Sequence, residues 1–306
     1  MKSEKIKLYE GRDDVTLTTY LLDDSPRAGK DGKRGAVLVC PGGAYLFCSD
    51  REGEPVAMAF ANMGYQVFVL RYSVFFAGKP TELVPGREYP VNPDSVFPAP
   101  MRDIGRAMLM IKEHADEWAV DADKVAICGF SAGGHNCAMY SVYWNHPIMT
   151  DYFGVAAEQL RPAAAILGYP LTDYVAMKAN VQADPEAGGL FGLANTAFLG
   201  TAEPDDELLA QASPARLVGQ QTPPTFIWST AADALVPIEQ STLYANALAA
   251  NKIPFEIHVF EDGPHGLSTA TQSSAEDRQQ LDQDARKWLP LCDAWLYKRF
   301  AFEYDS

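Results

Sequence analysis

The sequence has little of several features that define other classes of protein. It has only five cysteines among 306 residues, and none forms a CxxC pair: Cys40, Cys48, Cys128, Cys137 and Cys292. Disulfide scaffolds and zinc sites need paired or clustered cysteines, so we expect reduced thiols and a cytoplasmic location. No stretch reaches the roughly 18–20 apolar residues of a membrane helix. The opening segment lacks the apolar region of a signal peptide, so we expect neither a membrane span nor a leader.

Basic residues are also scarce. The chain has 25 Lys and Arg against 40 Asp and Glu, which gives a formal net charge of −15. An acidic surface repels phosphate backbones and anionic lipids, so we expect neither a nucleic-acid partner nor a membrane surface. We find no phosphate-binding glycine loop, no GxGxxG motif after a strand and no HExxH motif, so we expect no cofactor and no metal. The oligomeric state stays open, a homo-oligomer included.

Short apolar runs alternate with helical patterns along the chain. The runs are rich in β-branched, aromatic and small residues and lie at 35–40, 65–70, 124–129, 163–168, 224–228 and 255–260, with a half-apolar run at 15–22. Strands that are apolar on both faces are typical of a parallel sheet covered on both sides. The alternation predicts an α/β fold with a mostly parallel, doubly wound sheet and helices on both faces.

Two long segments interrupt this alternation, at about 74–98 and 174–223. Such segments often form binding-site rims or lids, so we expect one domain over 1–306 with two insertions. In the second insertion we expect one helix near 205–212. After 273–276, which has capping-box spacing, we expect a long C-terminal helix that is interrupted near Pro290. The first insertion has four aromatic residues that either stack on a sugar or pack within the loop: Phe75, Phe76, Tyr89 and Phe97.

A GxSxG motif, Gly129-Phe-Ser-Ala-Gly133, directly follows an apolar run and precedes a helical pattern. Between a strand and a helix, this motif is typical of a nucleophile elbow, because the glycines permit a sharp turn that exposes the serine hydroxyl. The amino end of the helix then directs free N–H groups toward that hydroxyl. We therefore predict that Ser131 is a nucleophile.

A serine hydroxyl needs a base at neutral pH, and the chain has five histidines. His265 lies in a turn after the last apolar run, at the carboxyl end of a predicted strand, where functional groups gather in an open α/β sheet. We predict that His265 is the general base. For the others we expect structural roles, because they lie within or at the ends of predicted helices and strands: His114, His135, His146 and His258.

The base needs a carboxylate to orient it. Asp233 follows the run at 224–228, at the carboxyl end of a predicted strand, although it could instead cap the helix that follows. Asp262 is nearer to His265 in sequence but shares its turn, which makes the geometry unfavourable. The predicted catalytic triad is Ser131, Asp233 and His265, in the chain order of an α/β-hydrolase.

Acyl transfer also needs N–H donors for the negative charge that develops on the carbonyl oxygen. The sequence Cys40-Pro-Gly-Gly-Ala-Tyr45 follows an apolar run, and its small residues allow the backbone to direct N–H groups into the site. We predict an oxyanion hole formed by the N–H groups of Gly43, Ala44 and Ala132.

Four segments together resemble one family. They are VLVCPGGAY at 37–45, DREGEPVA at 50–57, GFSAGGH at 129–135 and GPHG at 263–266. Over about 33–300 the chain is similar to the α/β-hydrolase esterases grouped with bacterial acetyl-xylan and feruloyl esterases. The resemblance implies the α/β-hydrolase fold and a serine carboxylesterase with an acyl-enzyme mechanism. Its substrates would be short acyl esters, such as acetyl groups on oligosaccharides derived from plant polysaccharides.

The resemblance matches the predicted triad and oxyanion donors to the family's functional residues, with two departures. Ala44 stands where many members have glycine, which could alter the acyl pocket. Ala232 stands where many members have a second acidic residue, which leaves Asp233 as the orienting carboxylate. Arg51 and Glu54, after the oxyanion turn, form either a structural ion pair or a substrate contact. We expect the two insertions to build the pocket for the alcohol part of the ester.

Two other functions stay open. A serine peptidase of the prolyl-oligopeptidase type has the same catalytic order, but such enzymes usually carry a propeller domain, for which 306 residues leave no room. A catalytically inactive, hydrolase-like binding protein would not need an intact triad. Comparing ester with amide substrates distinguishes a peptidase from an esterase. Labelling with a fluorophosphonate distinguishes an inactive binding protein from an active serine enzyme.

Overall fold

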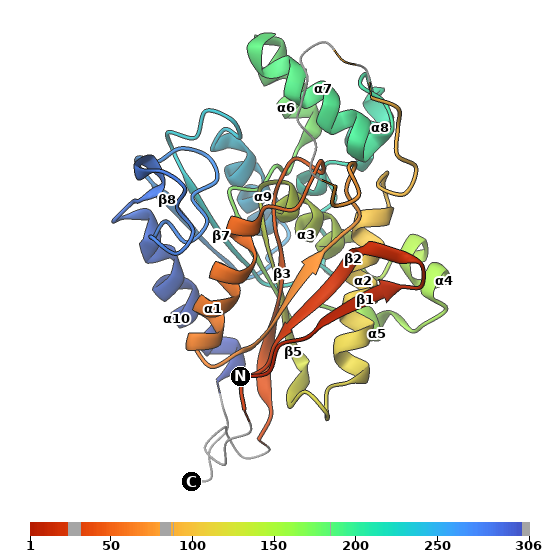
Figure 1. The fold of residues 1–306 in the computed structure, drawn as a ribbon. Helices are drawn as coiled ribbons and strands as arrows, with labels where there is room; N and C mark the ends of the chain where they lie inside the picture. The colour runs from red at the N-terminus through yellow and green to blue at the C-terminus, as the bar shows by residue number, and fades with distance from the viewer. Residues whose placement is uncertain (24–31, 80–86, 88, 184, 302–306) are drawn as a thin grey trace.

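The computed structural model describes residues 1–23, 32–79, 87, 89–183 and 185–301. Its centre is a sheet with the strand order β1-β2-β4-β3-β5-β6-β7-β8 (Figure 1). The first three strands of that order pair antiparallel, and all pairs from β4 onward are parallel. The strands are β1 (Lys5–Tyr9), β2 (Arg12–Tyr20), β3 (Arg34–Cys40), β4 (Gln66–Arg71), β5 (Val120–Phe130), β6 (Ala164–Gly168), β7 (Thr225–Thr230) and β8 (Phe255–Phe260).

Residues of the central strands alternate between two apolar layers. In β3, Ala36, Leu38 and Cys40 pack on one face, whereas Val37 and Val39 pack on the other. All five are fully buried. The run is apolar throughout because helices cover both faces of the sheet.

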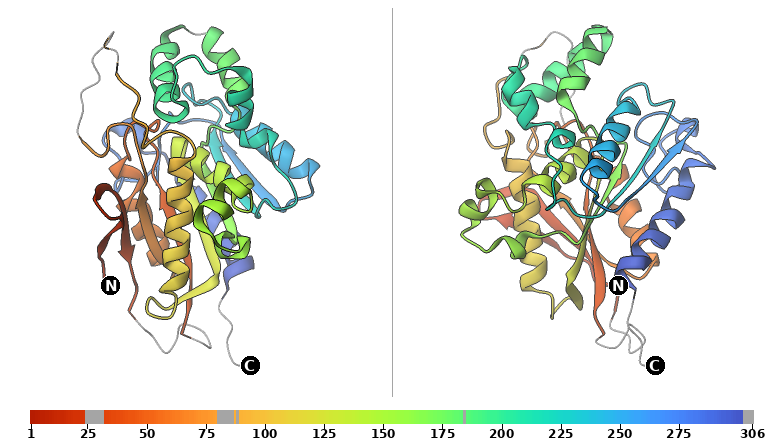
Figure 2. Two further views of the ribbon diagram at one scale, coloured as in Figure 1. Left: turned by 90° about the vertical axis from the view of Figure 1, so that its right-hand side faces the viewer. Right: turned by 180° about the vertical axis from the view of Figure 1, so that it is seen from behind.

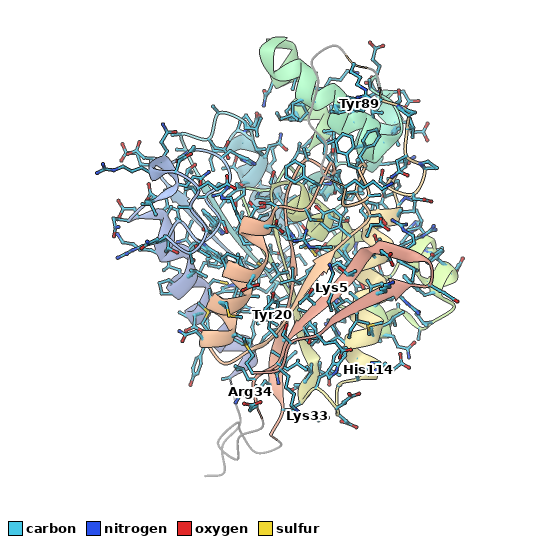
Figure 3. All side chains as sticks on the ribbon, in the orientation of Figure 1. Lys5, Tyr20, Lys33, Arg34, Tyr89 and His114 are labelled. Carbon is cyan, nitrogen blue, oxygen red and sulfur yellow. The ribbon has the colours of Figure 1, made fainter. Side chains whose placement is uncertain are left out.

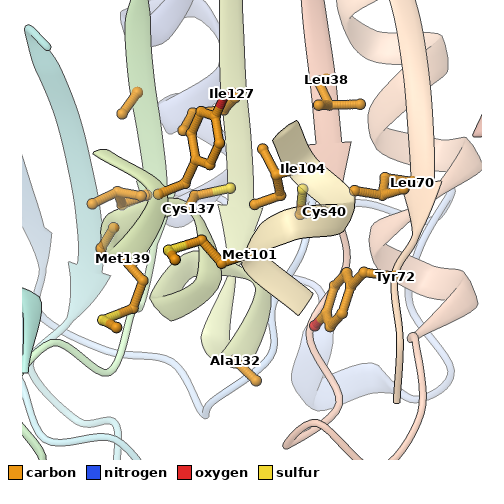
Figure 4. Packing of buried hydrophobic residues seen from close by; sticks show 14 of the residues in the cluster. Leu38, Cys40, Leu70, Tyr72, Met101, Ile104, Ile127, Ala132, Cys137 and Met139 are labelled. Atoms are coloured by element: carbon orange, nitrogen blue, oxygen red, sulfur yellow. The ribbon is translucent and has the colours of Figure 1, made fainter. Parts of the chain in front are cut away.

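Each face has its own set of helices (Figure 1). One face is covered by α2 (Ala99–Glu113), α3 (Ser131–Tyr143) and α9 (Glu239–Ala250), with the short helices α4 (Pro147–Phe153) and α5 (Ala157–Leu160). Figure 4 shows Met101 and Ile104 of α2 and Cys137 of α3 packed in this layer. The other face is covered by α1 (Glu54–Asn62) and α10 (Trp288–Phe300). The predicted mostly parallel, doubly wound α/β architecture is confirmed.

Beyond the carboxyl ends of the strands, residues 174–211 form a cap (Figures 1 and 2). It consists of α6 (Tyr174–Ala183), α7 (Pro185–Leu199) and α8 (Asp206–Gln211). The helix expected near 205–212 is confirmed as α8, with Asp205 as its N-cap. The expectation of a single helix was wrong. The apolar residues of α6 and α7 face more than one neighbour, so their sequences carry no single stripe at helical spacing.

Two terminal elements also differ from the prediction. The C-terminal helix α10 begins only at Trp288, and Pro290 lies in its first turn, where the missing N–H removes no helical hydrogen bond. The capping-box sequence at 273–276 is followed by turns and by the short 3-10 helices Arg278–Gln280 and Ala285–Lys287. The edge strand β1 has no apolar run that would predict it, because most of its residues are exposed or half-buried.

Candidate active site

Ser131 lies at a sharp turn between β5 and α3. Its φ is 51°, in the left-handed region that residues with side chains rarely adopt. A Cβ atom at Gly129 would lie 2.2 Å from the carbonyl oxygen of Gly133, and one at Gly133 would lie 2.1 Å from that of Cys40. Both glycines are therefore required by close backbone contacts, and the turn has the backbone geometry expected of a nucleophile elbow.

Hydrogen bonds join the three predicted triad side chains in series. His265 Nε2 lies 2.8 Å from Ser131 Oγ, and His265 Nδ1 lies 2.6 Å from Asp233 Oδ2. Asp233 follows β7 and His265 follows β8, so the ends of neighbouring parallel strands bring them together. The Asp233 side chain is 1% exposed and that of His265 is 14% exposed. The carboxylate is thus shielded from water, while the imidazole stays accessible beside the serine.

Asp233 contacts the backbone of the following turn as well as the imidazole. Its Oδ1 accepts hydrogen bonds from the N–H groups of Leu235 at 3.0 Å and Val236 at 2.9 Å. The capping alternative was wrong, because α9 begins at Glu239 with Ile238 as its N-cap. One carboxylate oxygen of Asp233 contacts the turn before that helix, and the other faces His265. The backbone bonds fix the rotation of the carboxylate and so aim Oδ2 at the ring.

The turn after β3 carries two of the predicted oxyanion donors. Gly43 has a φ of 126° and Ala44 has a φ of 54°. Their N–H groups donate to no residue that the structure describes. The N–H of Ala132 lies in the first turn of α3, where a helix leaves such groups without an intrahelical partner. Ala44 and Ala132 both line a cavity beside Ser131, so their backbone borders the space that a substrate would occupy.

Glu52 is a buried carboxylate that joins the two sides of the site, and the sequence patterns did not single it out. It is 3% exposed. It accepts hydrogen bonds from the Gly42 N–H at 2.7 Å and from the Tyr169 hydroxyl at 2.6 Å. That hydroxyl in turn accepts from the Ser268 N–H at 2.9 Å. The network therefore ties the oxyanion turn to the loop that carries His265.

Arg51 holds the same loop from the other side. Its guanidinium donates to the carbonyl of Gly266 at 2.9 Å, directly after His265. Of the alternatives left open by the sequence, the structural one has a different partner from the one named there. The guanidinium lies 4.0 Å from the Glu276 carboxylate, and Glu54 lies exposed in the first turn of α1. Of the two alternatives for Arg51, these contacts favour the structural one.

His135 has the structural position that the sequence predicts. It is fully buried, with Nδ1 at 2.5 Å from the Tyr45 hydroxyl and Nε2 at 2.8 Å from the Ala212 carbonyl oxygen. The carbonyl oxygen accepts, so Nε2 carries the proton. Burial lowers the pKa of His135 to about 4, which keeps it neutral. His114, at the end of α2, lies far from the cap (Figure 3).

A small cavity opens beside Ser131, with a volume of about 50 Å³. Ser131 lines this cavity and His265 does not, so the cavity borders the serine without bordering the imidazole. Its walls are mostly apolar and come from the oxyanion turn, the start of α3, the loops after β6 and β7, and the cap: Ala44, Tyr45, Ala132, His135, Leu171, Tyr174, Leu190, Phe191, Ala194, Leu235 and Val236.

The aromatic residues of the first predicted insertion pack against other aromatic rings. Ring centroids lie 5.1 Å apart for Phe75 and Phe76, 5.6 Å for Phe76 and Tyr89, and 5.8 Å for Phe97 and Phe198 of the cap. Tyr89 lies at the cap end of the molecule (Figure 3). None of the four lines the cavity beside Ser131. Residues 80–86 and 88 of this insertion lie outside the described residues.

The five cysteines are free. In the part of the chain that the structure describes, no group of three or more His, Cys, Asp or Glu side chains is placed to hold a metal ion. No helix in the same part is both long and apolar enough to cross a membrane.

Comparison with known proteins connects this geometry to a family. The model of the BD-FAE family matches residues 84–248. The chain is 38% identical over 259 residues to endo-1,4-beta-xylanase B of Butyrivibrio fibrisolvens, covering 83% of this chain and 35% of that protein. It is 26% identical over 258 residues to an acetylxylan esterase of Xylanibacter ruminicola, covering 83% and 45%. The chain thus spans less than half the length of these two curated relatives.

Solved structures agree over almost the whole chain. The carboxylesterase Cest-2923 from Lactobacillus plantarum is 26% identical, with a TM-score of 0.79 and 98% of each chain covered. An acetyl ester-xyloside bifunctional hydrolase from Caldicellulosiruptor lactoaceticus is 27% identical, with a TM-score of 0.71 and 96% of each chain covered. The class defined by fold and relatives is the esterases of the α/β-hydrolase superfamily, so the predicted resemblance is confirmed. Within that class, the chain belongs to the BD-FAE family.

Proposed function

We propose that the chain is a serine carboxylesterase that hydrolyses short acyl esters, in particular acetyl groups on sugars derived from plant polysaccharides. The observation that carries the proposal is the series of hydrogen bonds from Ser131 through His265 to Asp233. It lies beside the backbone N–H groups of Gly43, Ala44 and Ala132. Such an arrangement activates a hydroxyl and stabilises an oxyanion at the same point.

In the first half-reaction, Ser131 Oγ forms a bond to the ester carbonyl carbon while His265 Nε2 takes its proton. Asp233 holds the tautomer that has a proton on Nδ1 and stabilises the imidazolium. The N–H groups of the oxyanion hole bind the negatively charged oxygen. The bond from carbon to the alcohol oxygen then breaks, His265 gives its proton to that oxygen, and the acyl group stays on Ser131.

In the second half-reaction, water takes the place of the alcohol. His265 removes a proton from the water, whose oxygen forms a bond to the acyl carbon. The bond to Ser131 Oγ then breaks, and Oγ regains a proton from His265. The products are a carboxylic acid and the free enzyme, so the cycle needs no further reactant.

The geometry also separates the two parts of the ester. His265 must reach the leaving oxygen, so the alcohol lies on the imidazole side and the acyl group lies on the other side. The cavity of about 50 Å³ borders Ser131 but not the imidazole, so we assign it to the acyl group and call it the acyl cavity. Several of its walls come from the second insertion, which the sequence had led us to expect on the alcohol side. Its size and apolar walls favour a short acyl group. The names of two relatives, an acetylxylan esterase and an acetyl ester-xyloside hydrolase, support an acetylated sugar as the substrate.

The test is hydrolysis of p-nitrophenyl acetate by the wild type and by Ser131→Ala. We expect the variant to lose more than about 10⁴-fold in kcat, because it removes the nucleophile. Hydrolysis of acetyl, butyryl and feruloyl esters, and of acetylated xylo-oligosaccharides, then shows which acyl group and which alcohol part the enzyme prefers. Substantial turnover by Ser131→Ala contradicts the mechanism. Faster cleavage of aminoacyl amides than of esters would instead favour the peptidase alternative.

A further inference from the structure

We propose that Phe191 of α7 sets the limit on acyl-chain length, because its side chain separates the acyl cavity from a much larger cavity inside the cap. The inference rests on the proposed function and goes beyond it, since it names the residue that determines which acyl groups fit.

The larger cavity, here called the cap cavity, has a volume of about 580 Å³. That is within the range of about 300–1,000 Å³ that is typical of small-molecule sites. Its walls include Met177 of α6, Asn195 of α7 and Leu209 of α8. Residues of all three cap helices therefore line a partly open space, with Lys178 and Glu203 on its polar part. An extended acyl chain could lie against its apolar walls if that chain could enter from Ser131.

Two aromatic side chains, Tyr174 and Phe191, line both cavities and form the wall between them. Tyr174 is fixed in the core: it is 4% exposed, and its ring centroid lies 5.1 Å from that of His135 and 6.2 Å from that of Phe198. Phe191 is only half-buried and stacks on no aromatic ring of a described residue. A substitution can therefore remove the Phe191 part of the wall without opening the core.

The position of Phe191 on its helix explains this arrangement. Leu190 and Ala194, four residues apart on one helix face, line the acyl cavity only. Gly192 and Asn195 lie on an adjacent face and line the cap cavity only. Phe191 lies at the boundary of these two faces, so one side chain controls the connection between the cavities.

An acyl chain longer than the acyl cavity must displace Phe191 or stay outside the apolar walls. In an apolar pocket, one methylene group changes kcat/KM by about 10- to 200-fold. Removing the Phe191 ring lets additional methylene groups enter the cap cavity and pack against its apolar walls. We therefore expect the preference for acetyl over long acyl groups to weaken or reverse.

The experiment compares kcat/KM for p-nitrophenyl acetate and p-nitrophenyl octanoate in the wild type and in Phe191→Ala. We expect the octanoate-to-acetate ratio to rise at least about tenfold. Phe191→Val keeps an apolar side chain and should shift the ratio in the same direction by less, which provides the measurement if the alanine variant does not fold. An unchanged ratio in a folded variant overturns the inference.

A second variant shows whether the rise in the octanoate-to-acetate ratio depends on the cap cavity. Among the described residues, none beyond its own stretch of helix lies within 4 Å of a Cβ atom added at Gly192. Gly192→Leu can therefore place a side chain in that cavity from the neighbouring position. Alone, it should leave the octanoate-to-acetate ratio unchanged. Combined with Phe191→Ala, it should return the octanoate-to-acetate ratio to the wild-type value. A ratio that stays raised in the double variant overturns the inference. Failure of the proposed function would differ, because the wild type would then not hydrolyse acetate through Ser131.

Discussion

The two sides of Ser131 are built in different ways. Around the imidazole, hydrogen bonds of 2.6–2.8 Å join Asp233, His265 and Ser131. Bonds of 2.6–2.9 Å through Glu52 and Tyr169 join the backbone of the oxyanion turn to that of the His265 loop. On the acyl side, the cap contributes mainly apolar walls to a cavity of about 50 Å³ and a mixed polar and apolar lining to one of about 580 Å³. A buried hydrogen-bond network tolerates few geometries, whereas an apolar wall can change its volume at moderate cost. We infer that the first side determines the rate of the chemical steps and the second side the range of substrates.

The largest expected effect on catalytic rate comes from changing the hydrogen bond between Asp233 and His265. Asp233→Asn keeps the shape of the side chain, and its amide oxygen can still accept from the N–H groups of Leu235 and Val236. Its NH₂ group would face His265 Nδ1, so the imidazole must carry its proton on Nε2, where it cannot accept the proton of Ser131. We expect kcat for p-nitrophenyl acetate to fall about 10⁴-fold.

The control for Asp233→Asn is Asp262→Asn, an exposed carboxylate in the His265 turn, which should stay within about twofold of the wild type. A loss of less than tenfold in Asp233→Asn, with the melting temperature retained, would contradict the orienting role of Asp233.

An intermediate effect is expected where the network joins the oxyanion turn to the His265 loop. In Glu52→Gln, one oxygen becomes an NH₂ group. Facing Gly42 it displaces the N–H, and facing Tyr169 it donates to the hydroxyl, whose own proton then loses its acceptor, so the network must rearrange. A displacement near 1 Å costs about 10- to 100-fold in rate. We expect that loss in kcat, with KM changed much less, because the acyl cavity does not include Glu52.

Glu54→Gln is the matched control for Glu52→Gln, two residues away and exposed at the start of α1. Steady-state kinetics of both variants should show a kcat loss in Glu52→Gln alone. A change in KM without a change in kcat would contradict the positioning role of Glu52.

The smallest expected effect concerns stability, at the contact between the oxyanion turn and the cap. Burial lowers the pKa of His135 from 6.5 to about 4. Below pH 6.5 the unfolded chain binds a proton that the folded chain does not, so stability falls with pH until about pH 4. Asp103 acts in the opposite direction, because burial raises its pKa from 3.8 to about 6 and its protonation favours the folded state as pH falls.

A comparison of the wild type with His135→Gln isolates the histidine, since both proteins retain Asp103. Between pH 7 and 5.5, we expect the difference in their free energies of unfolding to shrink by about 1 kcal/mol, as measured by urea titration. A difference that stays constant or grows over this range would contradict a neutral, buried His135.

The sequence predicts those elements whose residue pattern lies within one short segment of the chain. The buried strands are continuous apolar runs, and Ser131, Asp233 and His265 each follow such a run. Glu52 carries no such signal, because its burial depends on Tyr169, 117 positions away. The role proposed for Phe191 depends on the packing of three cap helices, of which the sequence predicts only α8.

The most direct test of the central claim is whether Ser131 carries the acyl group during turnover. Wild-type protein is mixed with an acetyl ester, quenched in acid within the first turnovers and analysed by peptide mass spectrometry. The peptide that contains Ser131 should gain the mass of one acetyl group, and the corresponding peptide of Ser131→Ala should not. Turnover with the acetyl group on another residue, or with no acylated peptide under conditions that trap an acyl-enzyme, would contradict the account.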